Sequence, residues 1–253
     1  MEISERHKNK VAIVSGGANG IGKAVAQRLG REGASVAVFD IDRPELDKVV
    51  KALQNEHIDA SGYSVNVGSE AEVVHAVQAV YEKYGKIDIL IHAAGIVGPT
   101  STNITDYSAV DFDKIYEVNL KGTFLIAKFT LQVMEKTGTG RLLLISSIAG
   151  KEGNPGMVGY SATKAGVIGL VKGVAKEFAT THITVNGLAP SVIETPMNKD
   201  TAPEQLAYMK AKIPMQRLGT VEEVAALSCF IVSDENSFST GFIYDISGGR
   251  ATY

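Results

Sequence analysis

A tyrosine and a lysine about one helical turn apart form a pair of side chains that could do chemistry together. Tyr160 and Lys164 lie in the run GYSATKAG, which is expected to open a helix, and their spacing puts both side chains on one helix face. An isolated phenol has a pKa of about 10, too high for an efficient base at neutral pH. A nearby ammonium favours the phenolate, so we expect Lys164 to lower the pKa of Tyr160. Tyr160 could then take a proton from an alcohol or give one to a carbonyl oxygen.

Ser147 adds a third group to this pair. It follows the apolar run RLLLIS, an expected buried strand, and so falls at the carboxyl end of that strand. There its hydroxyl could hydrogen-bond the reacting oxygen as charge develops on it. A second Tyr-x-x-x-Lys pair, Tyr208 and Lys212, has no serine-ended strand before it, and we interpret it as a surface lysine near a packing tyrosine. Packing and strand-capping roles are the alternative for Tyr160 and Ser147.

A glycine-rich turn near the start of the chain predicts a dinucleotide site. SGGANGIG, residues 15–22, follows an apolar strand and opens a helix. Gly16 allows a tight turn, while Gly20 and Gly22 allow close approach of the backbone to a pyrophosphate and of the helix to the sheet. The N–H groups at the start of the helix can then bind the phosphates. Ala24 stands where a P-loop needs a magnesium-binding Ser or Thr, so we set that reading aside.

Asp40 ends the next strand and bears on the choice of dinucleotide. Its carboxylate can accept hydrogen bonds from the ribose hydroxyls of adenosine, and it would repel a 2′-phosphate. The position therefore favours NAD over NADP. Arg43 lies close in sequence and could weaken that discrimination. A solvated loop aspartate is the alternative.

Strand and helix patterns alternate along the whole chain. Strands are expected near 11–16, 35–40, 60–65, 87–91, 141–146, 183–189 and 242–246, and helices near 20–32, 43–55, 69–84, 108–136, 158–180 and 220–232. This order predicts right-handed βαβ crossovers and a parallel sheet covered on both faces. We therefore expect a single Rossmann-like α/β domain over residues 1–253, built on a doubly wound sheet of about seven strands.

The stretch of about residues 190–219 is the least regular part of the chain. It contains Pro190, Pro196, Pro203 and Pro214 and follows a strand, where open α/β sheets bind ligands. We expect this stretch to be a substrate lid. Residues expected to line or border the substrate pocket are Val97, Pro99, Lys151, Asn154, Met197 and Met215.

The composition excludes several classes of protein. Hydrophobic residues make up 45% of the chain, and the net charge of −3 gives no electrostatic reason to expect nucleic acid or an anionic membrane as partner. Cys229 is the single cysteine, so no intramolecular disulfide can form. The chain shows no signal-peptide pattern and no apolar run of transmembrane length. We expect a cytoplasmic protein that acts on a small molecule, with no metal site, since the five histidines lack ligand spacing.

Taken together, these motifs resemble the short-chain dehydrogenase/reductase family from Val11 to about Gly249. HAAG (92–95) is similar to the family's NAAG motif, VNLKG carries Asn119, SSIAG carries Ser147, YSATK carries Tyr160 and Lys164, and APSVIETPM (189–197) resembles the stretch that wraps the nicotinamide. The resemblance implies that Asn119 is a fourth catalytic residue, which helps to hold a proton-relay water beside the lysine. It implies cofactor contacts from Gly16, Asn19, Gly20, Ile21, Gly22, Asp40, Asn66, Val67, His92, Ala93, Gly95, Tyr160, Lys164, Pro190, Ile193 and Thr195.

Four positions depart from the family pattern. Ser15 stands in place of the usual Thr, His92 in place of Asn, Asn66 in place of the Asp that faces the adenine edge, and Ser191 in place of the Gly after a proline. An amide at position 66 can still bond the adenine. We interpret His92 as a packed histidine at a strand end and not as a catalyst.

Two subgroups of the family compete. The sequence as a whole resembles the 3-oxoacyl-[acyl-carrier-protein] reductases. These enzymes usually prefer NADPH and carry arginines that dock the acidic carrier. The matching positions, Gly138 and Thr181, are not basic. Together with Asp40, this favours an NAD-linked dehydrogenase of a free secondary alcohol, polyol, sugar or hydroxy acid.

Two further consequences follow from the resemblance. An NAD-binding module without catalysis is less favoured, because such a module has no need of all four catalytic residues. The family also implies a homotetramer that pairs the helices near 108–136 and 158–180 and the last strand. The end of the chain, YDISGGRATY, could then reach the site of a neighbouring subunit.

Overall fold

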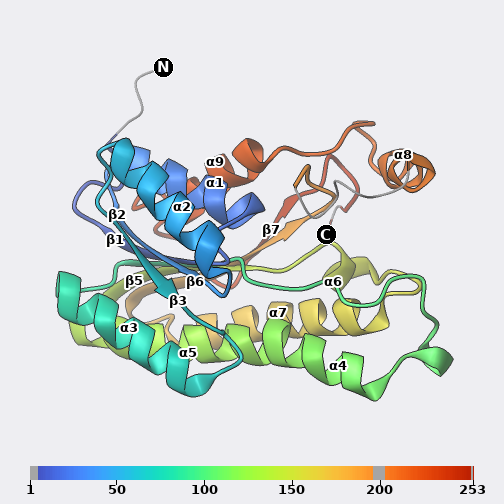
Figure 1. Ribbon diagram of the computed structural model, residues 1–253, viewed down its shortest axis with the longest axis horizontal. Coiled ribbons are helices and arrows are strands. Elements are labelled where there is room, and N and C mark those ends of the chain that lie inside the picture. The colour runs from blue at the N-terminus through green and yellow to red at the C-terminus, as the bar shows by residue number, and fades with distance from the viewer. Residues whose placement is uncertain (1–4, 196–202, 252) are drawn as a thin grey trace.

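The computed structural model describes residues 5–195, 203–251 and 253, and its centre is one parallel sheet of seven strands (Figure 1). The spatial order of the strands is β3-β2-β1-β4-β5-β6-β7. Their bounds are Val11–Ser15 (β1), Ser35–Asp40 (β2), Ala60–Ser64 (β3), Ile89–His92 (β4), Thr139–Ile145 (β5), His182–Pro190 (β6) and Ile243–Ile246 (β7). The predicted doubly wound α/β sheet is confirmed, with strand ends within about two residues of those expected.

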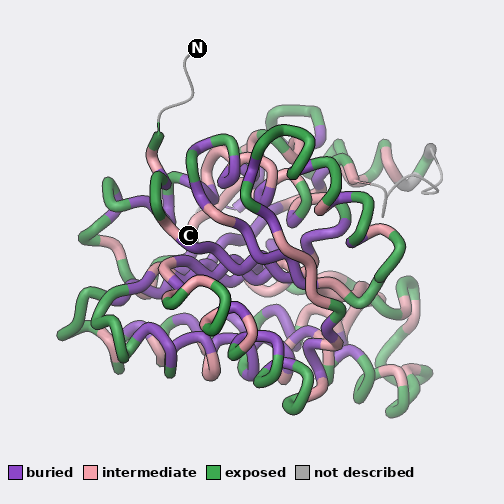
Figure 2. Tube along the Cα trace, turned by 60° about the vertical axis from the view of Figure 1, so that its left-hand side comes forward, coloured by how far each residue is buried: buried purple, intermediate pink, exposed green. Residues whose placement is uncertain are grey.

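Helices cover both faces of the sheet. Figure 1 shows α1 (Gly20–Arg31), α2 (Arg43–Asn55) and α9 (Val221–Ile231) on one face, and α3 (Glu70–Tyr84), α5 (Gly122–Thr137) and α7 (Val158–Glu177) on the other. Each face has its own apolar core, and the central strands contribute alternate side chains to the two cores. Figure 2 shows the consequence, since buried residues are concentrated in the sheet and on the inner sides of the helices. Burial on both faces explains the nearly continuous apolar runs of the strands.

Local capping explains where several helices begin and end. Asp42 accepts a hydrogen bond from the amide of Glu45 at the start of α2. Thr220 and Glu223 form a reciprocal capping box at the start of α9. Gly85 ends α3 in the left-handed conformation that glycine adopts without steric cost. These caps agree with the boundaries expected from the sequence.

The order of the strands reverses direction between β1 and β4. The chain moves outward from β1 to β3, then returns to β4 on the other side of β1. The loops after β1 and β4 therefore diverge at their carboxyl ends, which is where open α/β sheets bind nucleotides. The sequence motifs of the first glycine turn and of HAAG both lie at this edge.

Three parts of the fold were not anticipated in detail. The helix expected over 108–136 is divided into α4 (Ala109–Tyr116), a π-helical turn at Glu117–Lys121, and α5. A one-turn helix, α6 (Ala149–Glu152), follows Ser147, and a short 3₁₀ turn occupies Ile104–Asp106. The π-helical turn places Asn119 at a point where Thr123 Oγ1 donates to the Asn119 main-chain oxygen at 2.6 Å.

The expected lid is a long excursion between β6 and α9. Its described part contains α8 (Pro203–Ala211), while Pro196 and Met197 lie outside the described residues. The two ends of the excursion are joined where Ile193 pairs with Gly219. Lys212 is exposed and lies over the ring of Tyr208, as expected of a surface lysine, but Tyr208 on α8 is 60% exposed, so the packing role expected for this tyrosine was wrong. None of the described helices is long and apolar enough to cross a bilayer.

Candidate active site

Lys164 lies at the centre of the candidate catalytic residues, which are grouped at the carboxyl end of β5. It is on the first turns of α7, only 5% exposed, and its Nζ donates to the main-chain oxygen of Ile145 at 3.0 Å. Ser146 Oγ donates to the main-chain oxygen of Lys164 at 2.8 Å, which joins β5 and α7 a second time. Burial lowers the pKa of the Lys164 ammonium to about 8. Ser146 was not anticipated, although the double serine at the strand end was a signal for it.

Tyr160 and Ser147 meet beside this lysine. The Ser147 hydroxyl accepts a hydrogen bond from the amide of Ala149 at 3.1 Å and is also hydrogen-bonded to Tyr160. Burial raises the pKa of Tyr160 above its ordinary value, and the hydrogen bond with Ser147 opposes that rise. The expected lowering of the tyrosine pKa by Lys164 was wrong for this structure. Lys164 Nζ lies 5.8 Å from the centre of the Tyr160 ring and is directed to Ile145, so the loss of hydration of the phenolate dominates.

Asn119 joins three elements around the same point. It is fully buried; its Oδ1 accepts from the amide of Ile96 at 2.8 Å, and its Nδ2 donates to the oxygen of Ile96 at 2.8 Å. Nδ2 also lies 3.4 Å from Thr163 Oγ1 on α7. These bonds fix the loop after β4 against the helix that carries Tyr160 and Lys164. A Cβ at Gly95 would lie 3.3 Å from Asn119 Oδ1 and 3.4 Å from Lys164 Nζ, so this loop passes close to both polar atoms.

The glycine turn between β1 and α1 is closely packed. A Cβ on Gly22 would lie 2.1 Å from the oxygen of Gly16, and one on Gly16 would lie 2.6 Å from the amide nitrogen of Ala94. At Gly20, where φ is +50°, the near neighbour of such a Cβ is the Thr195 side chain at 3.4 Å. The turn therefore comes within contact of both the loop after β4 and the segment after β6. The amino terminus of α1 therefore lies where these three segments meet, which is where dinucleotide folds bind the phosphates.

The predicted cofactor residues lie along this carboxyl edge. They belong to the first turn (Gly16, Asn19, Gly20, Ile21, Gly22), to the ends of β2 and β3 (Asp40, Asn66, Val67), to the loop after β4 (His92, Ala93, Gly95), to α7 (Tyr160, Lys164) and to the segment after β6 (Pro190, Ile193, Thr195). Several of them have side chains that already contact other residues, Asn66 and Val67 among them. Asn66 Oδ1 accepts from the amide of Gly68 at 3.0 Å, and Val67 packs against Gly122 at the start of α5.

Asp40 is held in one orientation by main-chain donors. Its Oδ2 accepts from the amide of Ala18 at 2.9 Å, and its Oδ1 accepts from the amide of Asp42 at 3.0 Å. Arg43 is 63% exposed at its side chain and pairs with Asp47 at 2.9 Å. Arg43, which could have weakened discrimination against a 2′-phosphate, therefore pairs with a residue of its own helix and not with Asp40.

His92 has a structural environment. Its side chain is 1% exposed, and its Nδ1 lies 2.5 Å from Ser15 Oγ on the neighbouring strand β1. Burial and, to a smaller extent, the charge of Lys164 lower its pKa to about 3, so the ring is neutral at physiological pH. These facts agree with a packed histidine.

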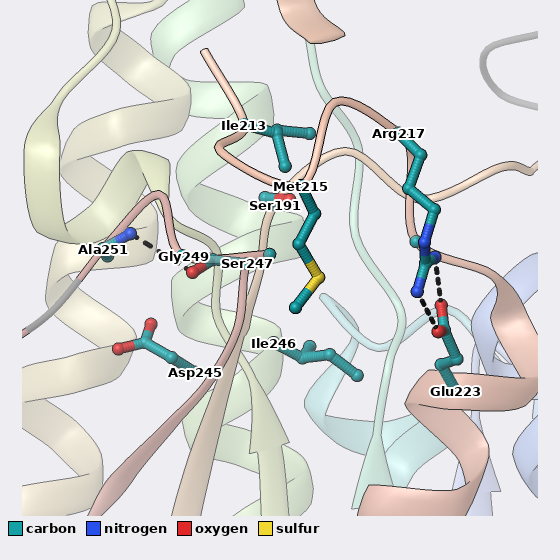
Figure 3. A pocket seen from close by; sticks show the side chains of 12 residues that line it. Ser191, Ile213, Met215, Arg217, Glu223, Asp245, Ile246, Ser247, Gly249 and Ala251 are labelled. Carbon is teal, nitrogen blue, oxygen red and sulfur yellow. Dashed lines mark hydrogen bonds and ion pairs between the residues drawn. The ribbon is translucent and has the colours of Figure 1, made fainter. Parts of the chain in front are cut away.

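A pocket of about 380 Å³ lies beside this group of residues. Figure 3 shows Arg217 and Glu223 paired on one side of it and Asp245 and Ala251 on the other. Of the residues expected to border a substrate, Met215 lines this pocket. The others that the structure describes, Val97, Pro99, Lys151 and Asn154, do not line it, and neither do Ser147, Tyr160 and Lys164. The catalytic candidates and this pocket are therefore separate parts of the carboxyl edge.

One cluster has metal-ligating side chains that are far apart in sequence. His7, Glu32 and Cys229 are all buried, and their ligand atoms lie within 4.8 Å of one another. Sequence spacing could not have shown this. However, Arg28 Nε binds Glu32 Oε1 at 2.6 Å and His7 Nε2 lies 3.1 Å from the main-chain oxygen of Cys229. With a cation already paired to Glu32, the cluster fits an anchor for the N-terminal segment better than a metal site.

A dinucleotide-type sheet with a serine, tyrosine and lysine at its carboxyl edge defines the class of nicotinamide-dependent oxidoreductases. The family model described as "Enoyl-(Acyl carrier protein) reductase" matches residues 16–251. The chain is 40% identical over 248 residues to 2-dehydro-3-deoxy-L-rhamnonate dehydrogenase (NAD(+)) of Sphingomonas sp. (strain SKA58), covering 98% of each. It is 38% identical over 244 residues to 3-oxoacyl-[acyl-carrier-protein] reductase FabG of Thermotoga maritima, covering 96% of this chain and 98% of that protein.

Solved structures agree with these relatives. A variant of actinorhodin polyketide ketoreductase with NADPH superposes with a TM-score of 0.90 at 32% identity, covering 96% of this chain and 98% of the other. The chain belongs to the short-chain dehydrogenase/reductase family. It is an oxidoreductase of CH–OH and carbonyl groups that uses a nicotinamide cofactor.

Proposed function

We propose that this chain catalyses the reversible, NAD-linked oxidation of a secondary alcohol of the polyol, sugar or hydroxy acid type to a ketone. The observation that carries the proposal is the meeting of Ser147, Tyr160 and Lys164 at the end of β5, with Asn119 fixing the adjacent loop. A bound nicotinamide would accept or supply the hydride. Single groups of this kind occur for structural reasons, but their combination around one point of a nucleotide crevice supports catalysis.

Each catalytic residue has a proposed role. Tyr160 takes the proton of the alcohol during oxidation and returns it to the carbonyl oxygen during reduction. Ser147 donates a hydrogen bond to the same oxygen and stabilises the charge that develops there. Lys164 supplies a buried positive charge next to the phenol, and Asn119 holds the loop after β4 in place and, as in the family, a water for proton relay.

The preference for NAD rests on Asp40. Its carboxylate is pinned by the amides of Ala18 and Asp42 at the end of β2, where the adenosine ribose lies in dinucleotide folds. A fixed negative charge there disfavours a 2′-phosphate. The 40% identical relative is named for NAD(+), whereas the structurally similar ketoreductase contains NADPH, so the choice depends on this chain's own residues.

Reduction of a 3-oxoacyl group on an acyl carrier protein is the second candidate. The 38% identity with FabG of Thermotoga maritima favours it. Against it stand Gly138 and Thr181, at positions where carrier-docking arginines are expected. Acetoacetyl-CoA with NADPH tests this alternative, because a carrier-linked reductase should reduce the thioester more efficiently than any free ketone.

The remaining expectations belong to the same proposal. Residues 1–253 form a single domain, with about 190–219 as a lid whose ends are joined at Ile193 and Gly219. The protein is a cytoplasmic homotetramer that pairs α4, α5, α7 and β7 with other subunits. Light scattering after size-exclusion chromatography tests the assembly, and a monomer would contradict it.

The test of the proposed function is a substrate screen run in parallel with NAD and NADP. Polyols, sugars and hydroxy acids are offered for oxidation, and the matching ketones and acetoacetyl-CoA for reduction. We expect NAD-linked turnover of free secondary alcohols. Efficient reduction of acetoacetyl-CoA with NADPH alone would favour the second candidate. Tight binding of NADH, followed by its fluorescence, without any turnover would identify a silent NAD-binding module.

A further inference from the structure

The last residues of the chain are attached to the segment that connects Ser147 with Tyr160. We define the C-terminal strap as residues 247–251 and 253. Lys151 Nζ donates to the main-chain oxygen of Tyr253, and Tyr253 Oη donates to the main-chain oxygen of Lys151 at 2.6 Å. The end of the chain is therefore attached to its own subunit through these two bonds.

The side chain of Lys151, on α6, is a largely buried cation. Its side chain is 7% exposed, and its Nζ pairs with Asp245 Oδ2 on β7 at 2.8 Å. The same ammonium lies 5.4 Å from the centre of the Tyr253 ring. Lys151 thus joins α6 to the edge strand of the sheet and to the strap at once.

Arg250 makes a second, independent connection from the strap. Its side chain is 9% exposed; its NH2 group lies 2.9 Å from Glu152 Oε2, and it donates to Asn154 Oδ1 at 3.2 Å. The amide of Asn154 in turn donates to Ser161 Oγ at 3.0 Å, next to Tyr160. The contacts of Arg250 therefore reach the start of the helix that carries the catalytic tyrosine.

The connection between Ser147 and Tyr160 needs such external support. Its helix, α6, has four residues, and a single helical turn has no stability of its own in water. Ser147 Oγ accepts from the amide of Ala149, the first residue of that turn, so a displacement of α6 moves the serine hydroxyl. What fixes α6 fixes the distance between the two groups that must meet the same substrate oxygen.

We propose that Lys151 and Arg250 are positioning residues, which use the C-terminal strap to hold Ser147 and Tyr160 at a fixed distance from each other. The expected effect on kcat rests on the proposed function, whereas the expected loosening of the strap and α6 rests on the contacts alone. Neither residue touches the reacting groups. A buried cation that loses its place leaves a carboxylate unpaired, so the strap and α6 should loosen together when either residue is replaced.

The test replaces each cation by methionine, as Lys151→Met and Arg250→Met, and adds Lys151→Arg as the conservative variant. Lys128→Met and Arg31→Met are matched controls, because these cations form ion pairs with Glu70 and Glu56 away from the strap. We expect kcat to fall about 10- to 100-fold in the two methionine variants, as for a small misplacement of catalytic groups, with NADH affinity nearly unchanged. Lys151→Arg should recover most of the rate.

A pH profile separates positioning from general destabilisation. The hydrogen bond between Ser147 and Tyr160 opposes the rise in the tyrosine pKa caused by burial. When that bond is weakened, the alkaline rise of the oxidation rate should shift to higher pH in Lys151→Met and Arg250→Met, and not in the controls. Unchanged kcat and an unchanged profile in both variants would overturn the proposal.

Hydrogen exchange of the holoenzyme gives a readout that needs no turnover. Amides of residues 147–161 should exchange faster in both methionine variants than in the wild type and the controls, while the strands β1 and β4 keep their protection. Unchanged exchange over 147–161 would overturn the proposal even if the enzyme is active. If no alcohol or ketone is turned over, the proposed function fails, and this measurement still decides the role of the strap.

Discussion

Ser15 and His92, on the neighbouring strands β1 and β4, are joined through Ser15 Oγ and His92 Nδ1 at 2.5 Å. The two residues stand opposite each other in the parallel register of these strands. Both depart from the usual residues of the family, Thr and Asn, and the structure shows that the two departures are partners. The bond joins the carboxyl ends of the two strands between which the strand order reverses.

Replacement of Ser15 tests this structural role. Ser15→Ala should lower the free energy of unfolding by about 1–3 kcal/mol, because it leaves His92 Nδ1 without its partner in the core. Urea denaturation measures the loss. Ser108→Ala is the control, since Ser108 is exposed and its side chain makes no capping bond at α4. Equal stability of the two variants would contradict the assignment.

We expect Lys164 to lower the free energy of unfolding and to be necessary for activity. Burial lowers its pKa to about 8 from an ordinary 10.5, so at pH 7 the folded protein holds a buried charge. Lys164→Met should therefore be more stable by on the order of 1–3 kcal/mol at pH 7, while kcat falls by about 100-fold or more.

The difference in stability should also depend on pH. Between about pH 8 and 10.5 the unfolded chain binds the proton that the folded chain has lost, so wild-type stability rises with pH relative to Lys164→Met. Thermal melts at pH 7 and pH 9.5 measure this. A variant that is less stable at both values would contradict the account.

Asp40 should decide between the two nicotinamide cofactors. Asp40→Ser removes the charge that repels a 2′-phosphate and weakens the hydrogen bonds to the ribose hydroxyls. We expect the ratio of kcat/KM for NAD over NADP to fall about 10- to 100-fold, corresponding to the loss of one or two charged hydrogen bonds. Steady-state kinetics with both cofactors measure it. Asp113→Ser, on α4, should leave the ratio unchanged, and an unchanged ratio in Asp40→Ser would contradict the role of Asp40.

The two directions of the reaction should respond oppositely to pH. Burial raises the pKa of Tyr160, so the phenol is protonated at neutral pH and ready to donate to a carbonyl. Oxidation needs the deprotonated form and should accelerate with rising pH, whereas reduction should slow over the same alkaline range. Profiles of kcat/KM in both directions test this, and parallel profiles would contradict proton transfer by Tyr160.

Much of the fold was predictable because its signals are local. The glycine turn, the apolar strands and the spacing of Tyr160 and Lys164 each lie within a few consecutive residues, and parallel βαβ crossovers then place them at one edge. The strands and main helices accordingly lie within a few residues of the expected ranges. The convergence of Ser147 with Tyr160 followed from the same logic.

Other features depend on tertiary distances that no local pattern encodes. The π-helical turn at Asn119 reflects bonds to Ile96 on another element, and the cluster of His7, Glu32 and Cys229 joins three distant segments. The expected direction of the Tyr160 pKa shift was wrong for a related reason. Sequence spacing brings Lys164 near, but only the structure shows its ammonium directed to Ile145 and the phenol partly buried.

The most direct test of the central claim is a comparison of Tyr160→Phe with the wild type on the best substrate from the screen. The substitution removes one oxygen atom and leaves the ring that packs against the site. We predict that kcat falls by about 100- to 10,000-fold while the affinity for NADH, measured by fluorescence titration, remains within a few-fold of the wild type. A variant that keeps its kcat would contradict the account, because the proton would then be transferred by a group other than this phenol.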